Sequence, residues 1–219
     1  MIFSFCDSAG EQNLTIKDEL FRYIIKARRH KIGDIIAFRN KDELNRLHSY
    51  ELLAINPKTA DFKLVESKTY EVKPKKYLHI GWCKVDVGSI EKALPSLCEM
   101  GVSKITFVSC DRSQRNFRLD FKRFNRIVEA SMQQSGRSDM LEFAESKSVL
   151  EFLKEYPNAL VFDFASEVFN GEARDVLIGC EGGFSEDERE LFKNICSFDS
   201  NMILKSESAV LAVASKVLL

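Results

Sequence analysis

Short apolar runs alternate with helical patterns through the last two thirds of the chain. Apolar runs bounded by turn residues predict strands, and apolar residues that recur every three or four positions predict helices. The predicted strands are 77–82, 105–109, 160–164, 176–178 and 202–204, and the predicted helices are 89–100, 120–134, 148–156 and 207–218. This order predicts an α/β fold with a mainly parallel sheet covered on both faces. Ligands bind such sheets beyond the carboxyl ends of the strands.

Some of these helices carry recognisable end signals. Asp120 is a candidate N-cap and Gly136 should end the same helix, while Ser148 and Glu151 form a capping pair. Pro95 lies inside the helix predicted over 89–100 and should kink or shorten it.

The amino-terminal third has a different pattern of hydrophobic residues. It predicts strands over 1–6, 34–38, 50–55 and 61–65 and a helix over 17–27. A compact β-barrel fits this pattern. The polar segment 71–76, EVKPKK, carries a proline and precedes the point at which strands and helices begin to alternate. The predicted domains are therefore 1–72 and 73–219.

The segment 177–188, LIGCEGGFSEDE, passes from an apolar strand through three glycines into a helix start. Glycines let a backbone turn sharply and approach a ligand closely. Ser185 and Glu188 form the S-x-x-E capping box that marks a helix N-terminus. A plain glycine-containing turn is the alternative, since a lone G-x-E-G-G motif is weak evidence.

A second stretch, MILKSESA over 202–209, again runs from apolar residues into a polar turn and a helix. Two such turns in succession predict two walls of one small-molecule pocket, because unpaired N–H groups at helix starts favour ligands.

The composition is that of an ordinary folded protein, with 45% hydrophobic and 30% charged residues. No apolar run approaches the roughly 18 to 20 residues that a membrane span needs, and the first residues lack the features of a signal peptide. We therefore expect a cytoplasmic protein without a membrane partner.

The six cysteines are scattered, with no C-x-x-C pair and no histidine at ligand spacing. Neither a metal site nor a disulfide framework is indicated. Buried, reduced thiols are the expectation.

The net charge of −1 hides an asymmetry. Residues 1–77 hold 15 Lys and Arg against 11 Asp and Glu, a net of +4, and the remainder has a net of −5. Two basic clusters, 22–31 and 112–126, hold five and six cations, and the second contains three phenylalanines and one aspartate. Basic patches mixed with aromatic residues favour RNA. A solvated helix face with its phenylalanines in the core explains the second cluster equally well.

Several common nucleotide and catalytic motifs are missing from the sequence. The turn after the first predicted strand of the sheet, CKVDVG, has no G-x-G-x-x-G, and no P-loop, H-E-x-x-H or nucleophile elbow occurs. None of the three histidines lies near the two late turns, which argues against an imidazole acid or base there.

Four segments together resemble one family. LIGCEGGFSEDE and LKSESAVLA are similar to the IGPEGG and LRTETA signatures of the ribosomal RNA uridine N3-methyltransferases of the SPOUT, or trefoil-knot, superfamily. IEKALPSLCEMGV over 90–102 resembles the helix that leads into E-x-G-V in that family, and EASMQQSGR over 129–137 resembles its E-A-x-x-Q-x-x-R helix. Arg28, Arg29 and Gly33-Asp34 are similar to its amino-terminal barrel. The likeness thus covers most of the chain.

The resemblance implies a PUA-like β-barrel over 1–72 that binds RNA and a knotted SPOUT domain over 73–219 that binds S-adenosylmethionine. It implies methylation of N3 of a uridine in 16S ribosomal RNA by a homodimer. Carried over by position, the cofactor residues are Phe162, Asp163, Gly179, Glu181, Gly182, Gly183, Ile203, Leu204, Ser206, Glu207 and Ser208. The candidate RNA-binding residues, from the family positions and the basic clusters, are Arg28, Arg29, Arg112, Arg115 and Arg137.

Three positions depart from the family pattern. Cys180 replaces a proline, so the glycine turn loses a fixed φ. Lys205 replaces an arginine, which keeps the charge and loses the bidentate fork. Ser89 stands where the family is often basic.

Methyl transfer to uridine N3 spreads negative charge onto the carbonyl oxygens of the base, which a nearby cation stabilises. Lys205 is the only cation in either late turn, so we hypothesise that it has this role, with a solvated turn lysine as the alternative. Glu181 and Glu207 are candidates to bond the cofactor or to fix the loops through backbone N–H groups, and the structural role fits Glu207 better.

Two alternatives stay open at this point. One is a SPOUT enzyme that acts on transfer RNA or on a ribose 2′-hydroxyl. The other is a non-catalytic, RNA-binding ribosome assembly factor. The departures from the family pattern at Cys180 and Lys205 are compatible with this alternative.

Overall fold

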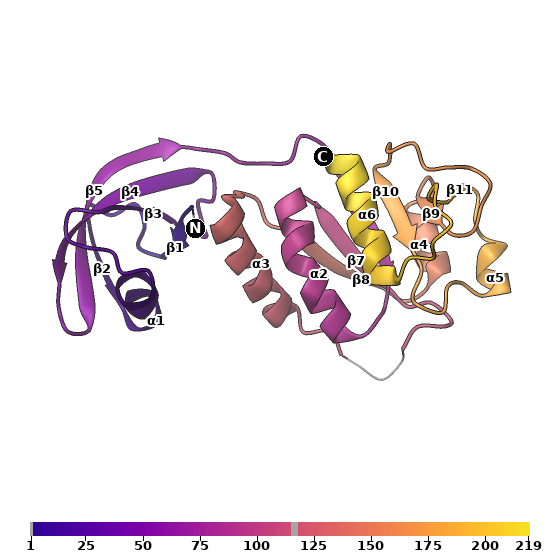
Figure 1. Ribbon diagram of the computed structural model, residues 1–219, viewed down its shortest axis with the longest axis horizontal. Coiled ribbons are helices and arrows are strands. Elements are labelled where there is room, and N and C mark those ends of the chain that lie inside the picture. Colours follow the sequence, from indigo (N-terminus) through magenta and orange to yellow (C-terminus); the bar gives the residue numbers. More distant parts are fainter. Residues whose placement is uncertain (1, 115–117) are drawn as a thin grey trace. The chain divides into compact units, whose positions relative to one another are not determined.

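The computed structural model describes residues 2–114 and 118–219. These residues form two compact units (Figure 1). The amino-terminal unit comprises Met1–Lys73 and Met132–Asp139, and the carboxyl-terminal unit comprises Pro74–Ser131 and Met140–Leu219.

The amino-terminal unit is a curled half-barrel sheet with one helical segment (Figure 1). Its strands are β1 (Ser4–Phe5), β2 (Asn13–Lys17), β3 (Ile35–Arg39), β4 (Arg46–Ile55) and β5 (Thr59–Thr69), in the order β1-β3-β4-β5-β2. The predicted helix over 17–27 is confirmed as α1 (Asp18–Phe21), which continues as the π-helix η1 (Arg22–Ala27). Strand β2 was not predicted.

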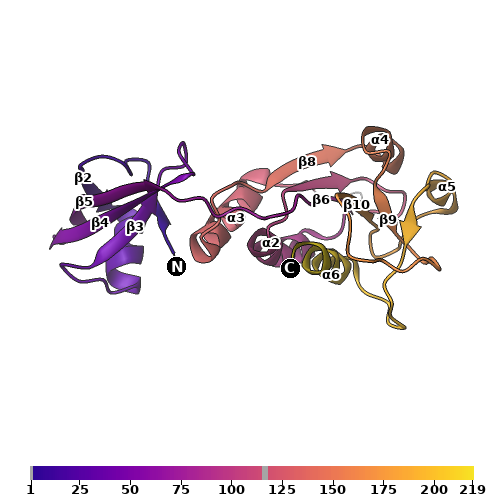
Figure 2. The ribbon, with the colours of Figure 1, turned by 90° about the horizontal axis from the view of Figure 1, so that it is seen from above.

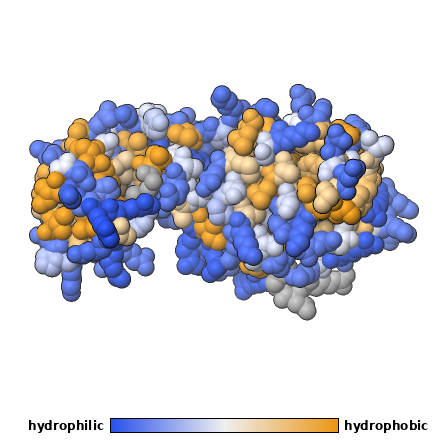
Figure 3. Space-filling view, viewed as in Figure 1, coloured by the Kyte–Doolittle hydropathy of each residue, from blue (hydrophilic) through white to orange (hydrophobic). Residues whose placement is uncertain are grey.

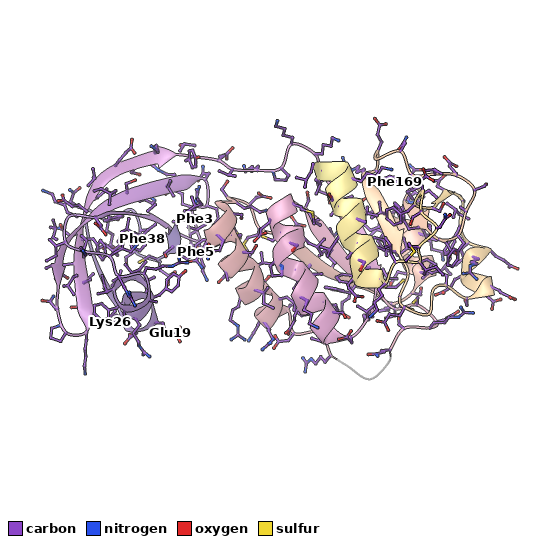
Figure 4. The ribbon with its side chains drawn as sticks, in the orientation of Figure 1. Phe3, Phe5, Glu19, Lys26, Phe38 and Phe169 are labelled. Carbon is purple, nitrogen blue, oxygen red and sulfur yellow. The ribbon has the colours of Figure 1, made fainter. Side chains whose placement is uncertain are left out.

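Aromatic residues fill the concave side of this sheet. The Phe38 ring meets Tyr50 and Phe62 edge-on, with centroids 5.7 and 5.5 Å apart. Phe3 and Phe5 form a separate edge-on pair at 5.0 Å on the opposite face, where the Arg39 guanidinium lies over the Phe3 ring (Figure 4). Edge-to-face pairs of this kind add to the burial energy of aromatic side chains.

The carboxyl-terminal unit is built on a six-stranded, entirely parallel sheet. Its strands are β6 (His79–Cys83), β7 (Lys104–Val108), β8 (Glu142–Ser146), β9 (Leu160–Phe162), β10 (Asp175–Ile178) and β11 (Ile195–Cys196), in the order β11-β9-β10-β6-β7-β8. Its helices are α2 (Val87–Met100), α3 (Phe121–Ser135), α4 (Val149–Glu155), α5 (Glu186–Arg189) and α6 (Ser206–Leu218). Figures 1 and 2 show α2, α3 and α6 on one face of the sheet and α4 on the other, as the sequence predicts.

The central strand β6 is buried on both faces, and alternate residues serve each side. The Trp82 indole reaches α6, where its Nε1 donates to Ser206 Oγ over 2.9 Å. Gly81 faces α4, and a Cβ added there would lie 2.4 Å from the Phe152 ring. Gly81 therefore permits the close packing of α4 on the sheet.

The helix end signals are confirmed where the chain is described. Asp120 Oδ1 accepts a hydrogen bond from the Arg123 N–H over 3.0 Å, and Gly136 ends α3 with a φ of +86°. Ser148 caps α4 by accepting from the Glu151 N–H. Local chemistry alone specifies these ends.

One strand prediction was wrong, and one of the two effects predicted for a proline does not occur. Segment 202–204 is not a strand: Met202 and Ile203 are 76% and 79% exposed and pair with no strand among the described residues. Of the two effects predicted for Pro95, shortening does not occur, since α2 continues to Met100, and Ser131 Oγ donates to the Pro95 carbonyl over 2.9 Å.

No helix in the described parts of the chain combines the length and the apolar character needed to cross a membrane.

Two buried histidines make stability depend on pH. His79 lies between Asp175 Oδ1 at 2.9 Å and Thr106 Oγ1 at 2.8 Å, and the His48 ring nitrogens have no partner within the described residues. Burial lowers the pKa of both side chains from the ordinary value of 6.5. The unfolded chain therefore binds protons that the folded chain does not.

We expect the free energy of unfolding to be highest above pH 7 and to fall as the pH drops through 6.5 and below. Each histidine contributes at most about 1.4 kcal/mol per pH unit. Urea titrations at half-unit steps from pH 7.5 to 5.5 measure the slope, and His79→Gln should reduce it. An equal slope in His79→Gln would contradict the assignment to His79.

Candidate functional site

A cavity of about 780 Å³ opens at the carboxyl edge of the parallel sheet. It is lined by residues from the loops after β9 and β10, from the loop after β11 and from the start of α6. Its size lies within the range of small-molecule sites, about 300 to 1,000 Å³. The position beyond the strand ends is the one that parallel sheets favour for ligands.

Ser206 ties the two late turns together. Its hydroxyl accepts from the Trp82 indole and donates to the Gly179 carbonyl over 2.5 Å. Because Ser206 begins α6 and Gly179 begins the glycine turn, one side chain fixes both segments to the central strand β6. The prediction that the two turns form two walls of one cavity is confirmed.

The glycine turn needs its glycines for two reasons. Gly183 has a φ of +65°, a conformation that other residues rarely adopt. A Cβ on Gly182 would lie 3.2 Å from the Cβ of Arg112, whose Nη1 donates to the Gly182 carbonyl over 2.9 Å. The turn is thus held close to the loop that follows β7.

The predicted capping box starts α5 and also fixes this neighbouring loop. Glu188 Oε2 accepts from the Ser185 N–H and Ser185 Oγ accepts from the Glu188 N–H, as the S-x-x-E motif predicts. Glu188 Oε1 accepts from the Asp111 N–H over 2.9 Å, and Ser185 Oγ donates to Asp111 Oδ2 over 2.6 Å. The chain after β7 is therefore held against the start of α5.

One wall of the cavity carries an ion pair. Arg189 Nε donates to Asp163 Oδ2 over 2.6 Å and Arg189 Nη2 donates to Oδ1 over 3.3 Å. The Asp163 carboxylate raises the pKa of Arg189, and the fork holds the carboxylate in one orientation. The charge of Asp163, which the sequence predicts as a cofactor residue, is thus largely neutralised.

Most of the predicted cofactor residues meet at this cavity. The lining contains Phe162, Asp163, Gly179, Glu181, Gly182, Gly183, Ile203, Leu204 and Ser206. Lys205, Glu207 and Ser208 are not part of it. Lys205 is exposed between two lining residues, and Glu207 has one buried carboxylate oxygen without a partner in the described chain. Their roles stay predictions.

Sequence reasoning missed several lining residues. They are Arg112, Phe164, Ala165, Ser166, Ile178, Cys180, Phe184, Arg189, Ser197, Phe198, Ser200, Met202 and Ala209. Arg112 was predicted for RNA rather than for the cavity. The segments 164–166 and 197–200 follow the ends of β9 and β11, and the rule that ligands lie beyond strand ends could have located them.

The cavity has an apolar rim. Phe164, Met202 and Ile203 are 78%, 76% and 79% exposed. Figure 3 shows hydrophobic side chains gathered near the end of the molecule that holds β9 and β10. Behind this rim Phe169, labelled in Figure 4, packs edge-on against Phe162 with ring centroids 4.9 Å apart.

Arg28 and Arg29 lie just after η1 in the amino-terminal unit, and both are exposed. Arg28 Nη2 donates to the Tyr23 hydroxyl over 2.8 Å, and its guanidinium lies 5.2 Å from the centre of that ring. Arg29 has a φ of +60°, an uncommon conformation for a residue other than glycine. The two arginines are thus adjacent in the sequence and exposed, and contacts with Tyr23 hold the Arg28 guanidinium.

The other candidate RNA-binding residues lie in different surroundings. Arg112 is exposed next to the glycine turn. The Arg137 side chain is only 5% exposed and pairs with Asp139 over 2.8 Å, so its RNA contact stays a prediction. Arg115 lies outside the described residues.

Within residues 2–114 and 118–219, no group of three or more histidine, cysteine, aspartate or glutamate side chains is arranged to hold a metal ion.

Comparison with known proteins places the chain among RNA-modifying enzymes. Residues 72–218 match the model of a family described as an RNA methyltransferase domain. The chain is 39% identical to the ribosomal RNA small subunit methyltransferase E of Helicobacter pylori strain 26695, over 98% of each sequence.

Solved structures of lower identity share the fold. The S-adenosylmethionine complex of a ribosomal RNA small subunit methyltransferase E from Neisseria gonorrhoeae aligns with a TM-score of 0.79, 19% identity and coverage of 98% and 95%. A putative methyltransferase of Legionella pneumophila, also with bound S-adenosylmethionine, aligns with a TM-score of 0.77 at the same identity and coverage.

Proposed function

This chain belongs to the ribosomal RNA small subunit methyltransferase E family, within the SPOUT superfamily, and from that membership we propose that it methylates small-subunit ribosomal RNA. The donor is S-adenosylmethionine and the acceptor is N3 of a uridine in 16S RNA. The observation that carries the proposal is the tie at Ser206, which joins the two signature turns into one cavity of suitable size.

The lining suits the proposed cofactor. Phe162, Ile178 and Leu204 offer an apolar wall for a nucleobase, and the glycine turn offers backbone polar groups without side chains in the way. The exposed Glu181 adds a carboxylate for a cationic group. When bound, S-adenosylmethionine supplies a methyl group that its sulfonium has already activated.

The chain's own residues then mainly align the acceptor and exclude water. Phe164, Met202 and Ile203 line the cavity and are exposed. We assign to Lys205 the stabilisation of charge on the uracil carbonyl oxygens, since it lies between Leu204 and Ser206, which both line the cavity. Its ammonium is exposed and has no partner among the described residues.

Further assignments follow from the family. We assign the binding of RNA to residues 1–72, which include Arg28 and Arg29. We assign the methyl transfer reaction to residues 73–219. We also propose that the chain acts as a homodimer in the cytoplasm, where its ribosomal substrate is made.

The direct test uses small ribosomal subunits from a strain that lacks this enzyme family. Incubation with the chain and methyl-labelled S-adenosylmethionine should yield one N3-methyluridine in 16S RNA, identified by nuclease digestion and mass spectrometry. Label in a ribose, or only in added transfer RNA, would favour the other SPOUT activities. Calorimetry without any cofactor binding would favour an assembly factor.

RNA binding should be largely electrostatic. We expect the affinity for small-subunit RNA to fall steeply between 50 and 200 mM salt, because bound phosphates release counterions. Replacing both Arg28 and Arg29 by alanine should weaken binding for all sequences and reduce the slope of log affinity against log salt by about one per lost phosphate contact.

Filter binding over a salt series measures this slope. Arg174→Ala is a suitable control, because Arg174 is an exposed arginine outside the candidate RNA-binding set. An affinity independent of salt, or an equal change in Arg174→Ala, would contradict the prediction.

A further inference from the structure

Three adjacent parallel strands each place a cysteine near their carboxyl ends. Cys83 is the last residue of β6, Cys110 lies two residues after β7, and Cys180 lies two residues after β10. Because β6 is flanked by β10 and β7, the three thiols converge at one edge of the sheet. Cys110 Sγ lies 3.4 Å from Cys180 Sγ, and Cys83 is fully buried beside them.

We propose that Cys110 and Cys180 form an oxidisable thiol pair, a modification site for hydroperoxides that controls the shape of the glycine turn. The geometry carries this inference. The two sulfurs are already in contact, and a disulfide needs them to approach by only about 1.3 Å to the usual bond length. Cys180 stands where the IGPEGG signature, which the glycine turn resembles, has proline, so that signature does not supply this thiol.

The surroundings of Cys110 favour the reactive thiolate form. The Cys180 and Cys83 side chains, in contact with Cys110, lower the pKa of its thiol, and Ser113 Oγ, 2.9 Å from its sulfur, adds to the effect against burial. The bond to Cys110 and burial raise the pKa of Cys180. Cys110 is therefore the attacking thiol, since thiolates are the nucleophiles in this chemistry.

An oxidant can approach Cys110 without passing through the cofactor cavity. Cys180 lines the cofactor cavity, whereas Cys110 lines a separate cavity of about 500 Å³ together with Ser113, Lys84 and Lys147. The thiol pair thus forms part of the wall between the two cavities.

The reaction balances with one hydroperoxide for each disulfide. The Cys110 thiolate attacks the terminal oxygen of the hydroperoxide, the O–O bond breaks, and an alcohol or water leaves after protonation. The resulting sulfenic acid is attacked by the Cys180 sulfur, which loses its proton, and water leaves as the S–S bond forms. Both sulfurs are oxidised and the peroxide is reduced.

The disulfide would alter the wall of the cofactor site. Cys180 Sγ now donates to the Gly183 carbonyl over 3.5 Å, and this contact is lost when the sulfur bonds Cys110. The Gly182 carbonyl accepts a hydrogen bond from Arg112, which lies two residues after Cys110. Formation of the disulfide would therefore move Cys180 while Gly182 stays bonded to Arg112. The backbone of 179–183 must shift, and a misplacement of about 1 Å can lower a reaction rate about 100-fold.

The test treats the full chain with hydrogen peroxide and maps its peptides. We expect a cross-linked peptide pair containing Cys110 and Cys180, altered hydrogen exchange at amides 179–184, and reversal of both by dithiothreitol. The affinity for S-adenosylmethionine, measured by calorimetry, should fall on oxidation, because Cys180 lines the cofactor cavity. This last readout rests on the proposed function, whereas the first two need no cofactor.

Two variants and a control separate the possibilities. Cys110→Ser should form no cross-link and keep its cofactor affinity after peroxide, and Cys180→Ser should form no cross-link either. Cys6→Ser removes a half-buried thiol of the amino-terminal unit and should behave like the parent chain. No cross-link in the parent chain, a cross-link that leaves 179–184 unchanged, or an equal affinity loss in Cys110→Ser would overturn the proposal. Failure of the reduced chain to bind cofactor would count against the proposed function alone.

Discussion

A Ser206→Ala chain is expected to fold, to lose about 2 kcal/mol of stability and to bind S-adenosylmethionine at least about tenfold more weakly. The substitution leaves the buried Trp82 N–H without an acceptor and the Gly179 carbonyl without this donor. An unsatisfied buried polar group costs about 1 to 3 kcal/mol. Since the same hydroxyl sets the separation of the two cavity walls, affinity should fall together with stability.

Urea titration and calorimetry measure the two effects. Ser215→Ala is the matched control, because Ser215 lies on the same helix and is exposed. It should change neither quantity. Cofactor affinity within twofold of the parent in Ser206→Ala, despite the expected loss of stability, would show that this tie does not shape the cavity.

Lys205→Ala is expected to lower the rate constant for methyl transfer about 100-fold and to leave cofactor affinity nearly unchanged. The expectation rests on the proposed role of the ammonium beside the uracil carbonyl oxygens, for which the loss of one charge-stabilising donor typically costs about 100-fold to 1,000-fold. Lys205 does not line the cofactor cavity, so binding and chemistry should separate.

Single-turnover assays on small subunits, with cofactor saturating, give the rate constant directly. Lys205→Arg restores the residue type that the family carries, and it should recover most of the rate. A Lys205→Ala chain that methylates at the parental rate would reduce this lysine to a solvated residue at the start of α6.

Signals confined to a few neighbouring residues predicted local structure well. The Ser185 and Glu188 capping box, the Asp120 cap and the glycine at 136 all lie where the sequence places them. The two caps depend on a side chain that accepts from a backbone N–H three residues away, and Gly136 ends its helix because glycine adopts a positive φ without strain. Such chemistry is independent of the rest of the fold.

Strands that depend on their partners were harder to predict. Strand β8 is a half-exposed edge strand that starts with Glu142, and β11 has only two residues. For the apolar stretch 202–204 the error was the opposite one, because a strand was predicted where none forms. This stretch borders a cavity, and two of its residues are exposed. Hydropathy cannot distinguish a buried strand from a hydrophobic rim around a ligand site.

The candidate site was located by its glycines, and its finer architecture required the order of the strands. Periodicity identifies strands without showing which are neighbours. The approach of Cys83, Cys110 and Cys180 follows only from the order β10-β6-β7. The pairing of Asp163 with Arg189 likewise joins residues 26 positions apart through the fold.

The contact between Trp82 and Ser206 spans 124 positions of sequence. During translation, a nascent chain that has emerged through β11 already contains all six strands of the parallel sheet, yet one side of its cavity is missing and the Trp82 indole has no acceptor. The cofactor site is therefore completed only when α6 has left the ribosome.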